Sequence, residues 1–174
     1  MINVTALVQL KAFARQDGAI LALAWVTSFA SIIYSPQYSF GNLLAMATPF
    51  IVGWRMMKFR DYALDGVMSF RRGFAYSCYT FFYASLIFAL AQYLYFTLLD
   101  GGRMATMLND TVRMLTPIYQ EQGISADEIN LVATQFANLK PIELSLIFMM
   151  QNLFIGLLLS LPLALIGKRA TART

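Results

Sequence analysis

The sequence predicts an all-α polytopic membrane protein with four transmembrane helices and two amphipathic helices in an external loop. Hydrophobic residues make up 59% of the chain and charged residues 13%. A mean hydropathy of +0.60 is typical of polytopic membrane proteins and unusual for soluble domains. Four apolar segments are long enough, or nearly so, to cross a bilayer. When they are taken as spans, ten of the 13 Lys and Arg residues fall on one side of the membrane.

The predicted spans cover residues 18–34, 40–54, 73–99 and 143–166, so residues 1–174 are expected to form a single membrane domain. A helix needs about 20 residues to cross the hydrocarbon core, and the first two segments are shorter. The uncharged turn Ser35-Pro36-Gln37 between them predicts a tight helical hairpin. The alternative to the first span is a signal peptide cleaved after Ser28-Phe29-Ala30, which would leave the remaining topology unchanged.

The basic residues predict the orientation of the chain. Two precede the first span, five lie between the second and third, and three follow the fourth: Lys11, Arg15, Arg55, Lys58, Arg60, Arg71, Arg72, Lys168, Arg169 and Arg173. The loop at residues 100–140 carries only Arg103, Arg113 and Lys140. By the positive-inside rule, we expect both termini on the cytoplasmic side of the membrane and residues 100–140 outside.

The external loop contains two patterns typical of amphipathic helices. Apolar residues recur at helical spacing from Arg103 to Tyr119, and Pro117 indicates a distortion near the end. A capping box, Ser125-Ala-Asp-Glu128, predicts the start of the second helix. We expect both helices to lie on the outer membrane surface or to cap the bundle. A hydrophobic cradle for a lipid or a partner helix stays the alternative.

The composition excludes several kinds of active site. The chain has no His and a single Cys, Cys78, so it cannot form an internal disulfide, a Cys/His zinc site or an imidazole base. No ionisable residue other than Tyr or Cys lies near the middle of a predicted span. The sequence therefore predicts no catalytic residue, no metal site and no cofactor, and we do not expect an enzyme. Nucleic-acid binding is not expected either, because the basic residues flank apolar segments.

The loop between the second and third spans is predicted to be an interfacial helix over residues 55–72, with Phe59, Tyr62 and Phe70 on one face. It carries five cations, which we interpret as a docking surface for membrane lipids or an acidic protein partner: Arg55, Lys58, Arg60, Arg71 and Arg72.

Polar residues inside the predicted spans indicate helix–helix contacts. Gln92 and Asn152 lie at similar distances from the outer ends of their spans, which predicts an interhelical hydrogen bond near Gly156. A stripe of tyrosines and leucines on the third span predicts packing contacts: Tyr76, Tyr79, Tyr83, Leu86, Leu90 and Tyr93. The alternative is a lipid-handling or passive transport protein whose groove is lined by this stripe with Gln92 and Asn152.

Four stretches resemble those of a known family: Phe13-Ala-Arg-Gln-Asp-Gly18, Lys58-Phe-Arg-Asp61, Ser69-Phe-Arg-Arg72 and Phe81-Phe-Tyr-Ala-Ser85. They are similar to domain-of-unknown-function family 4199, small integral membrane proteins of Bacteroidota. The family has no assigned activity, so the resemblance implies no catalytic residue. Genes of this family often neighbour that of a glycosyltransferase resembling polyprenyl-phosphate mannose synthases. We therefore expect a non-catalytic inner-membrane scaffold or anchor for a membrane-surface partner such as that enzyme, with homo-oligomerisation left open.

Overall fold

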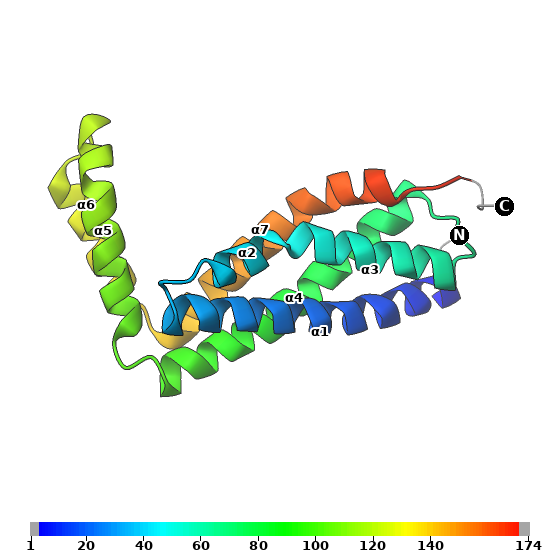
Figure 1. Cartoon of the computed structure of the whole chain (residues 1–174), viewed down its shortest axis with the longest axis horizontal. Helices are drawn as coiled ribbons and strands as arrows, with labels where there is room; N and C mark the ends of the chain where they lie inside the picture. The colour runs from blue at the N-terminus through cyan, green and yellow to red at the C-terminus, as the bar shows by residue number, and fades with distance from the viewer. Residues whose placement is uncertain (1–3, 171–174) are drawn as a thin grey trace. The chain divides into compact units, whose positions relative to one another are not determined.

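The computed structural model describes residues 4–170, which form seven helices and no β-strand (Figure 1). The helices are α1 (Val4–Tyr34), α2 (Phe40–Met46), α3 (Thr48–Ala63), α4 (Phe70–Leu98), α5 (Arg103–Glu121), α6 (Ala126–Ala137) and α7 (Pro141–Gly167). Among these residues, three helices are long and apolar enough to span a membrane: α1, α4 and α7. The all-α prediction is confirmed. Arg173, one of the cations used for the orientation, lies outside the described residues.

The second predicted span, residues 40–54, is not one long apolar helix. It is divided between α2, of seven residues, and α3, of 16 residues, which extends nine residues beyond the predicted end. The division falls at Ala47, directly before Thr48 and Pro49. Proline has no amide hydrogen and its ring clashes with the preceding turn, so the helix is interrupted here. Neither piece alone reaches the length of a span, and a four-span arrangement is not confirmed.

The prediction of one interfacial helix over residues 55–72 is wrong. Its first half continues α3 to Ala63, and its last three residues begin α4. Between them the backbone takes positive φ at Asp65 (51°) and Gly66 (77°), and the Gly66 amide donates to the Arg60 carbonyl at 3.1 Å. This left-handed closure is a common helix C-terminus, and it turns the chain back into the bundle.

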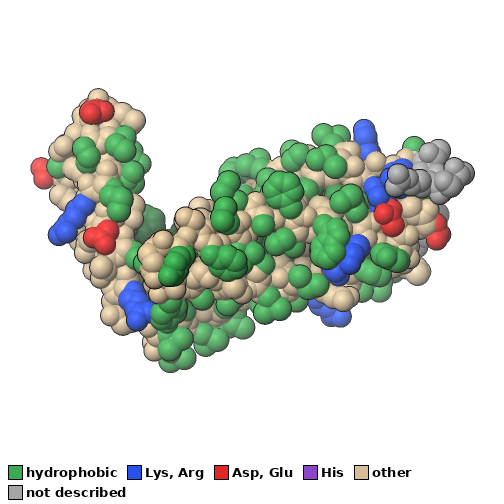
Figure 2. Space-filling model, viewed as in Figure 1, with side chains coloured by type: hydrophobic (Ala, Val, Ile, Leu, Met, Phe, Trp, Pro, Cys, Tyr) green, Lys and Arg blue, Asp and Glu red, His purple; other side chains and the backbone are tan. Residues whose placement is uncertain are grey.

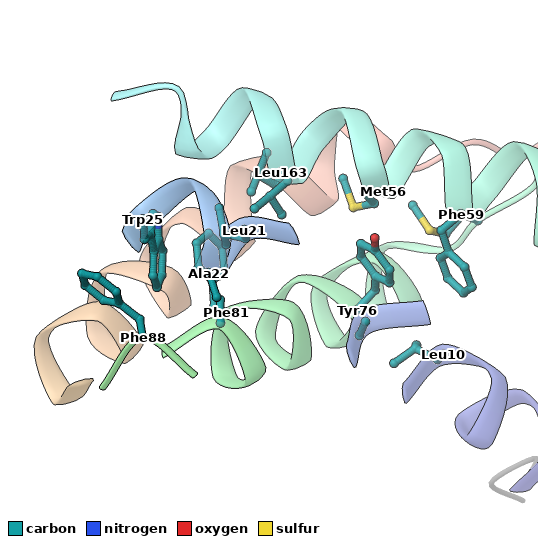
Figure 3. Close-up of a cluster of buried hydrophobic side chains, with 14 residues drawn as sticks. Leu10, Leu21, Ala22, Trp25, Met56, Phe59, Tyr76, Phe81, Phe88 and Leu163 are labelled. Atoms are coloured by element: carbon teal, nitrogen blue, oxygen red, sulfur yellow. The ribbon is translucent and has the colours of Figure 1, made fainter. Parts of the chain in front are cut away.

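The chain forms two compact units, which we call unit 1 (residues 4–91 and 147–170) and unit 2 (residues 92–146). The core of unit 1 joins α1, α3, α4 and α7 (Figure 3). Its large buried side chains come from helices far apart in sequence: Leu10, Leu21, Trp25, Met56, Phe59, Tyr76, Phe81, Phe88 and Leu163. Trp25 contacts the rings of Phe81 and Phe88 with centroids 6.3 and 5.6 Å apart. Aromatic contacts thus bind α1 to α4.

The helical hairpin at residues 35–37 is confirmed, and Pro36 lies at its centre. Three pairs of residues form hydrogen bonds across it, and the first two of these pairs are equidistant, or nearly so, from Pro36 in the sequence. Gln9 Nε2 donates to the Ala63 carbonyl at 3.3 Å, Trp25 Nε1 donates to Thr48 Oγ1 at 2.9 Å, and Ser28 Oγ donates to the Gly41 carbonyl at 2.7 Å. Ser28, part of the cleavage site considered for a signal peptide, therefore lies in the interface of α1 with α2.

Glycines allow three helices of unit 1 to approach closely. A Cβ atom added to Gly18 of α1 would lie 2.8 Å from the Thr80 carbonyl oxygen of α4, and one added to Gly156 of α7 would lie 2.5 Å from Phe81 Cγ. At Gly53 of α3, the nearest atom is a terminal methyl carbon of Leu163, at 3.3 Å. The first contact is against backbone, which cannot move aside as a flexible side chain can.

In unit 2 the structure has two helices, α5 and α6, over the residues where the two amphipathic helices were predicted. The capping box is present: Glu128 N donates to Ser125 Oγ at 3.2 Å, and Ser125 N donates to Glu128 Oε2 at 3.1 Å. Pro117 lies inside α5, and α7 begins at Pro141. No residue of α5 or α6 is fully buried, and their apolar side chains are only partly covered: Met114, Leu131 and Val132 are 70%, 60% and 53% exposed.

Candidate functional site

An ionic network lies in the interior of unit 1, where α1, α3 and α4 meet. Arg55 Nε of α3 donates to Asp17 Oδ1 of α1 at 2.5 Å, and the same two side chains form a salt bridge. The Tyr76 hydroxyl of α4 donates to the other carboxylate oxygen. Asp17 is 2% exposed, Tyr76 is fully buried and the Arg55 side chain is 19% exposed. A buried carboxylate is costly unless it is paired and hydrogen-bonded, and here both of its oxygens are occupied.

Aromatic rings close the network from the other sides. The Phe59 ring stacks on the Tyr76 ring with centroids 4.8 Å apart and planes 6° from parallel, and Phe13 covers Phe59 with centroids 5.1 Å apart. At 2% exposure, the side chain of Asp17 offers almost no surface to a substrate. The arrangement instead joins three helices at one level of the bundle, which is a structural role.

A second interior cation ties α3 to the end of α7. Arg60 is 6% exposed, and its Nε and one terminal nitrogen donate to the two carboxylate oxygens of Asp61 at 2.7 and 3.1 Å. Its other terminal nitrogen donates to the Gly167 carbonyl at 3.2 Å. Met68 and Arg169 exchange backbone hydrogen bonds of 3.0 and 2.9 Å beside it. Arg60 therefore holds the α3–α4 turn against the end of α7.

The five cations predicted to form a docking surface are separated by these contacts. Arg55 and Arg60 hold the interior together and are not available to a partner. Arg72 is half-buried and donates to Gln9 Oε1 at 3.4 Å. Lys58 lies over the Trp54 ring, 4.1 Å from its centroid, and Arg71 is exposed.

Cations from other helices surround the same end of unit 1. Among the described residues, five of them form neither an ion pair nor a side-chain hydrogen bond, and we call these the cationic end: Lys11, Arg15, Lys58, Arg71 and Lys168. Figure 2 shows Lys and Arg side chains gathered toward the end of unit 1 that carries the α3–α4 turn. The surface charge of this end thus comes from α1, α3, α4 and the residue after α7, and not from one loop.

The predicted bond between Gln92 and Asn152 stays a prediction. Gln92 is 2% exposed, and its amide oxygen accepts no hydrogen bond from the described residues. In unit 1, Gly73 faces Ala164 and Phe81 faces Gly156, so α4 and α7 run antiparallel. Extending that register places Ser85 level with Asn152. Gln92 lies seven residues further along α4, about 10 Å.

The tyrosine stripe does not lie along one groove. Tyr76 is in the interior network, whereas Leu86 and Leu90, which continue the stripe, are 51% and 60% exposed. Tyr79 and Tyr83 stack on each other with centroids 6.4 Å apart. This packing gives no support to a groove lined by the stripe.

Sequence reasoning missed Asp17 as a functional residue, because it was placed just before the first span. In the structure α1 begins at Val4, so Asp17 lies in the middle of a 31-residue helix. A signal for its partner is present in the sequence. Asp17 and Arg55 are equally distant from Pro36, so a helical hairpin centred there brings opposite charges to the same level.

Over residues 4–170 the structure defines an all-helical protein of membrane type, with three helices long and apolar enough to span a bilayer and a nearly inaccessible carboxylate in its interior. Comparison with protein families matches residues 16–169 to DUF4199, a protein of unknown function. The chain belongs to this family, as the four sequence stretches indicated. Comparisons with curated proteins and with solved structures gave no match.

Proposed function

We propose that this chain is a non-catalytic scaffold or anchor of the bacterial inner membrane, which binds an acidic membrane-surface protein with its cationic end. The observation that supports the proposal is the set of five cations with neither an ion pair nor a side-chain hydrogen bond, which come from α1, α3, α4 and the residue after α7 at one end of unit 1. A polyprenyl-phosphate glycosyltransferase is the candidate partner.

The proposal requires the cationic end to face the cytoplasm. We propose four crossings, in which α2 and α3 together make the second. They are separated only by Ala47 and would measure about 35 Å as a helical pair, enough for the hydrocarbon core. The ten-to-three division of basic residues supports cytoplasmic termini. In a Cys78→Ser background, a cysteine at Gln122 should react with an external reagent and one at Arg71 should not. The reverse pattern would refute the orientation.

Electrostatics make this end suited to a charged surface. Each basic residue near an anionic surface contributes about 1 kcal/mol of attraction. This attraction decays over the Debye length, which is about 10 Å at 0.1 M salt. Anionic lipids compete for the same cations, but a protein partner presents carboxylates in a fixed pattern and can be released as an intact complex. The binding should therefore weaken steeply as salt increases.

The test compares two variants with the same change of charge. One replaces Arg15, Arg71 and Lys168 with glutamine, and the control replaces Arg103, Arg113 and Lys140. All six are exposed. After extraction in mild detergent at low salt, the glycosyltransferase should co-purify with the wild type and the control, and be lost from the first variant and at high salt. If the first variant inserts correctly and keeps the enzyme, or the wild type never retains it, the proposal is wrong.

A further inference from the structure

An apolar groove of about 690 Å³ lies between α5 and α6 in unit 2. The two helices are joined by a short turn in which Gly123 has positive φ (84°). The groove is lined mainly by aliphatic side chains, among them Leu108, Val112, Leu115, Ile129, Val132 and Phe136. Its volume falls in the range of about 300–1,000 Å³ that is usual for ligand pockets. Since neither helix has a buried residue, the hairpin does not fill this space with its own side chains.

Charge is segregated from the groove on α5. Successive residues of an α-helix are turned by about 100°, so Asp110, Arg113 and Glu121 project to the side opposite Leu108 and Leu115. A helix with one charged and one uncovered apolar face lies at the boundary between water and hydrocarbon.

Short connections hold the groove at the membrane surface. Four residues link α4 to α5 and three link α6 to α7, and α4 and α7 are both long and apolar enough to span a bilayer. Four extended residues reach about 14 Å at most. The links are themselves ordered: Met104 N donates to Asp100 Oδ1 at 3.0 Å, and Lys140 N donates to Glu143 Oε2 at 2.7 Å. The start of α5 and the end of α6 therefore lie close to the ends of α4 and α7.

We propose that this groove binds an acyl chain of a zwitterionic phospholipid with an amine headgroup, taken from the leaflet at which α4 and α7 end. Bilayer lipid is the hydrocarbon within reach of the short links. Glu128 is the charged residue in the groove lining, and its carboxylate is complementary to a headgroup ammonium. Residues 100–143 contain six carboxylates and three cations, which disfavours an anionic headgroup. This binding is independent of docking at the cationic end.

The groove can be blocked without adding charge. The full chain is placed in vesicles of phosphatidylethanolamine and phosphatidylglycerol, in which one of the two lipids carries a photoactivatable group on an acyl chain. Labelled peptides are then mapped by mass spectrometry. Ala133→Trp fills the groove and should lower labelling of α5 and α6 by about tenfold, since it removes the buried surface available to the chain. Met114→Trp is the control, because Met114 is 70% exposed and does not line the groove.

A second variant tests the headgroup and preserves the fold. Glu128→Gln keeps the capping box, which accepts Gln in place of Glu. It should reduce the preference for labelled phosphatidylethanolamine over labelled phosphatidylglycerol about three- to fivefold, the effect of losing one exposed ion pair. Equal labelling of the Ala133→Trp and Met114→Trp variants would show that the helices contact lipid without binding a chain in the groove, and would overturn the proposal. Cross-linking to a second copy or to another protein in place of lipid would also overturn the proposal.

Discussion

Replacing Asp17 with leucine removes the acceptor of two buried donors at once. The Arg55 guanidinium loses its ion pair, and the fully buried Tyr76 hydroxyl loses its acceptor. Breaking a buried ion pair by deleting one partner costs about 3–5 kcal/mol, and an unsatisfied hydroxyl about 1–3 kcal/mol. Because the Arg55 side chain keeps 19% exposure, water can relieve part of the cost. We expect the free energy of unfolding to fall by about 3 kcal/mol.

The paired replacement separates lost charge pairing from lost packing. Asp17→Leu combined with Arg55→Met removes both charges, and apolar replacement of a whole buried pair is often neutral. The double variant should therefore recover most of the loss. Asp110→Leu is the control, because this carboxylate lies on the exposed side of α5.

Unfolding can be followed in detergent micelles by the fluorescence of Trp25, which is 8% exposed and lies against two phenylalanine rings. Linear extrapolation of the denaturant dependence gives the free energies. A single Asp17→Leu variant as stable as the wild type would contradict the structural role of the network. So would a double variant no more stable than the single one.

Five further variants test close packing, capping and burial. Gly18→Ala should destabilise unit 1 by about 1–3 kcal/mol, because the added methyl group meets the backbone of α4. Gly53→Ala should be neutral or stabilise by up to about 1 kcal/mol through helix propensity, because its methyl group meets a movable side chain. Thermal unfolding compares the two variants. Ser125→Ala should cost about 1 kcal/mol and speed hydrogen exchange at the start of α6, and unchanged exchange there would contradict the cap. Ser85→Ala should not lower the free energy of unfolding, because the buried Ser85 hydroxyl has no hydrogen-bond partner among the described residues. Ser28→Ala should lower it by about 1 kcal/mol, because the Ser28 hydroxyl donates to the Gly41 carbonyl. Equal losses in the two variants would contradict these hydrogen-bond assignments.

Local patterns predicted the elements that depend on neighbouring residues. The capping box at Ser125 forms because its partner is three residues away, and the hairpin turn forms at Pro36 because proline and its polar neighbours disfavour a continuous helix. The apolar periodicity of residues 103–119 is likewise sufficient for an amphipathic helix. These features need no knowledge of the rest of the chain.

The predictions for residues 55–72 are wrong for a different reason. Charge by itself does not show that a side chain is exposed. Arg55 and Arg60 were assigned to a surface helix because cations are seldom buried unless they are paired. Their partners are 38 residues away in one case and adjacent in the other, and α7 supplies a further acceptor for Arg60. These partners cannot be recognised from composition, which is why the second span was predicted to end at Trp54.

By itself, the sequence determined the helical class, the apolar helices and the family, because composition, periodicity and short motifs are local properties of the chain. The tertiary structure decided which charges are neutralised inside and which remain on the surface. A guanidinium such as that of Arg55 has the same formal charge in both places. Its role is set by whether folding brings a carboxylate within hydrogen-bonding distance, which depends on helix register and on the close approach allowed at Gly18 and Gly156.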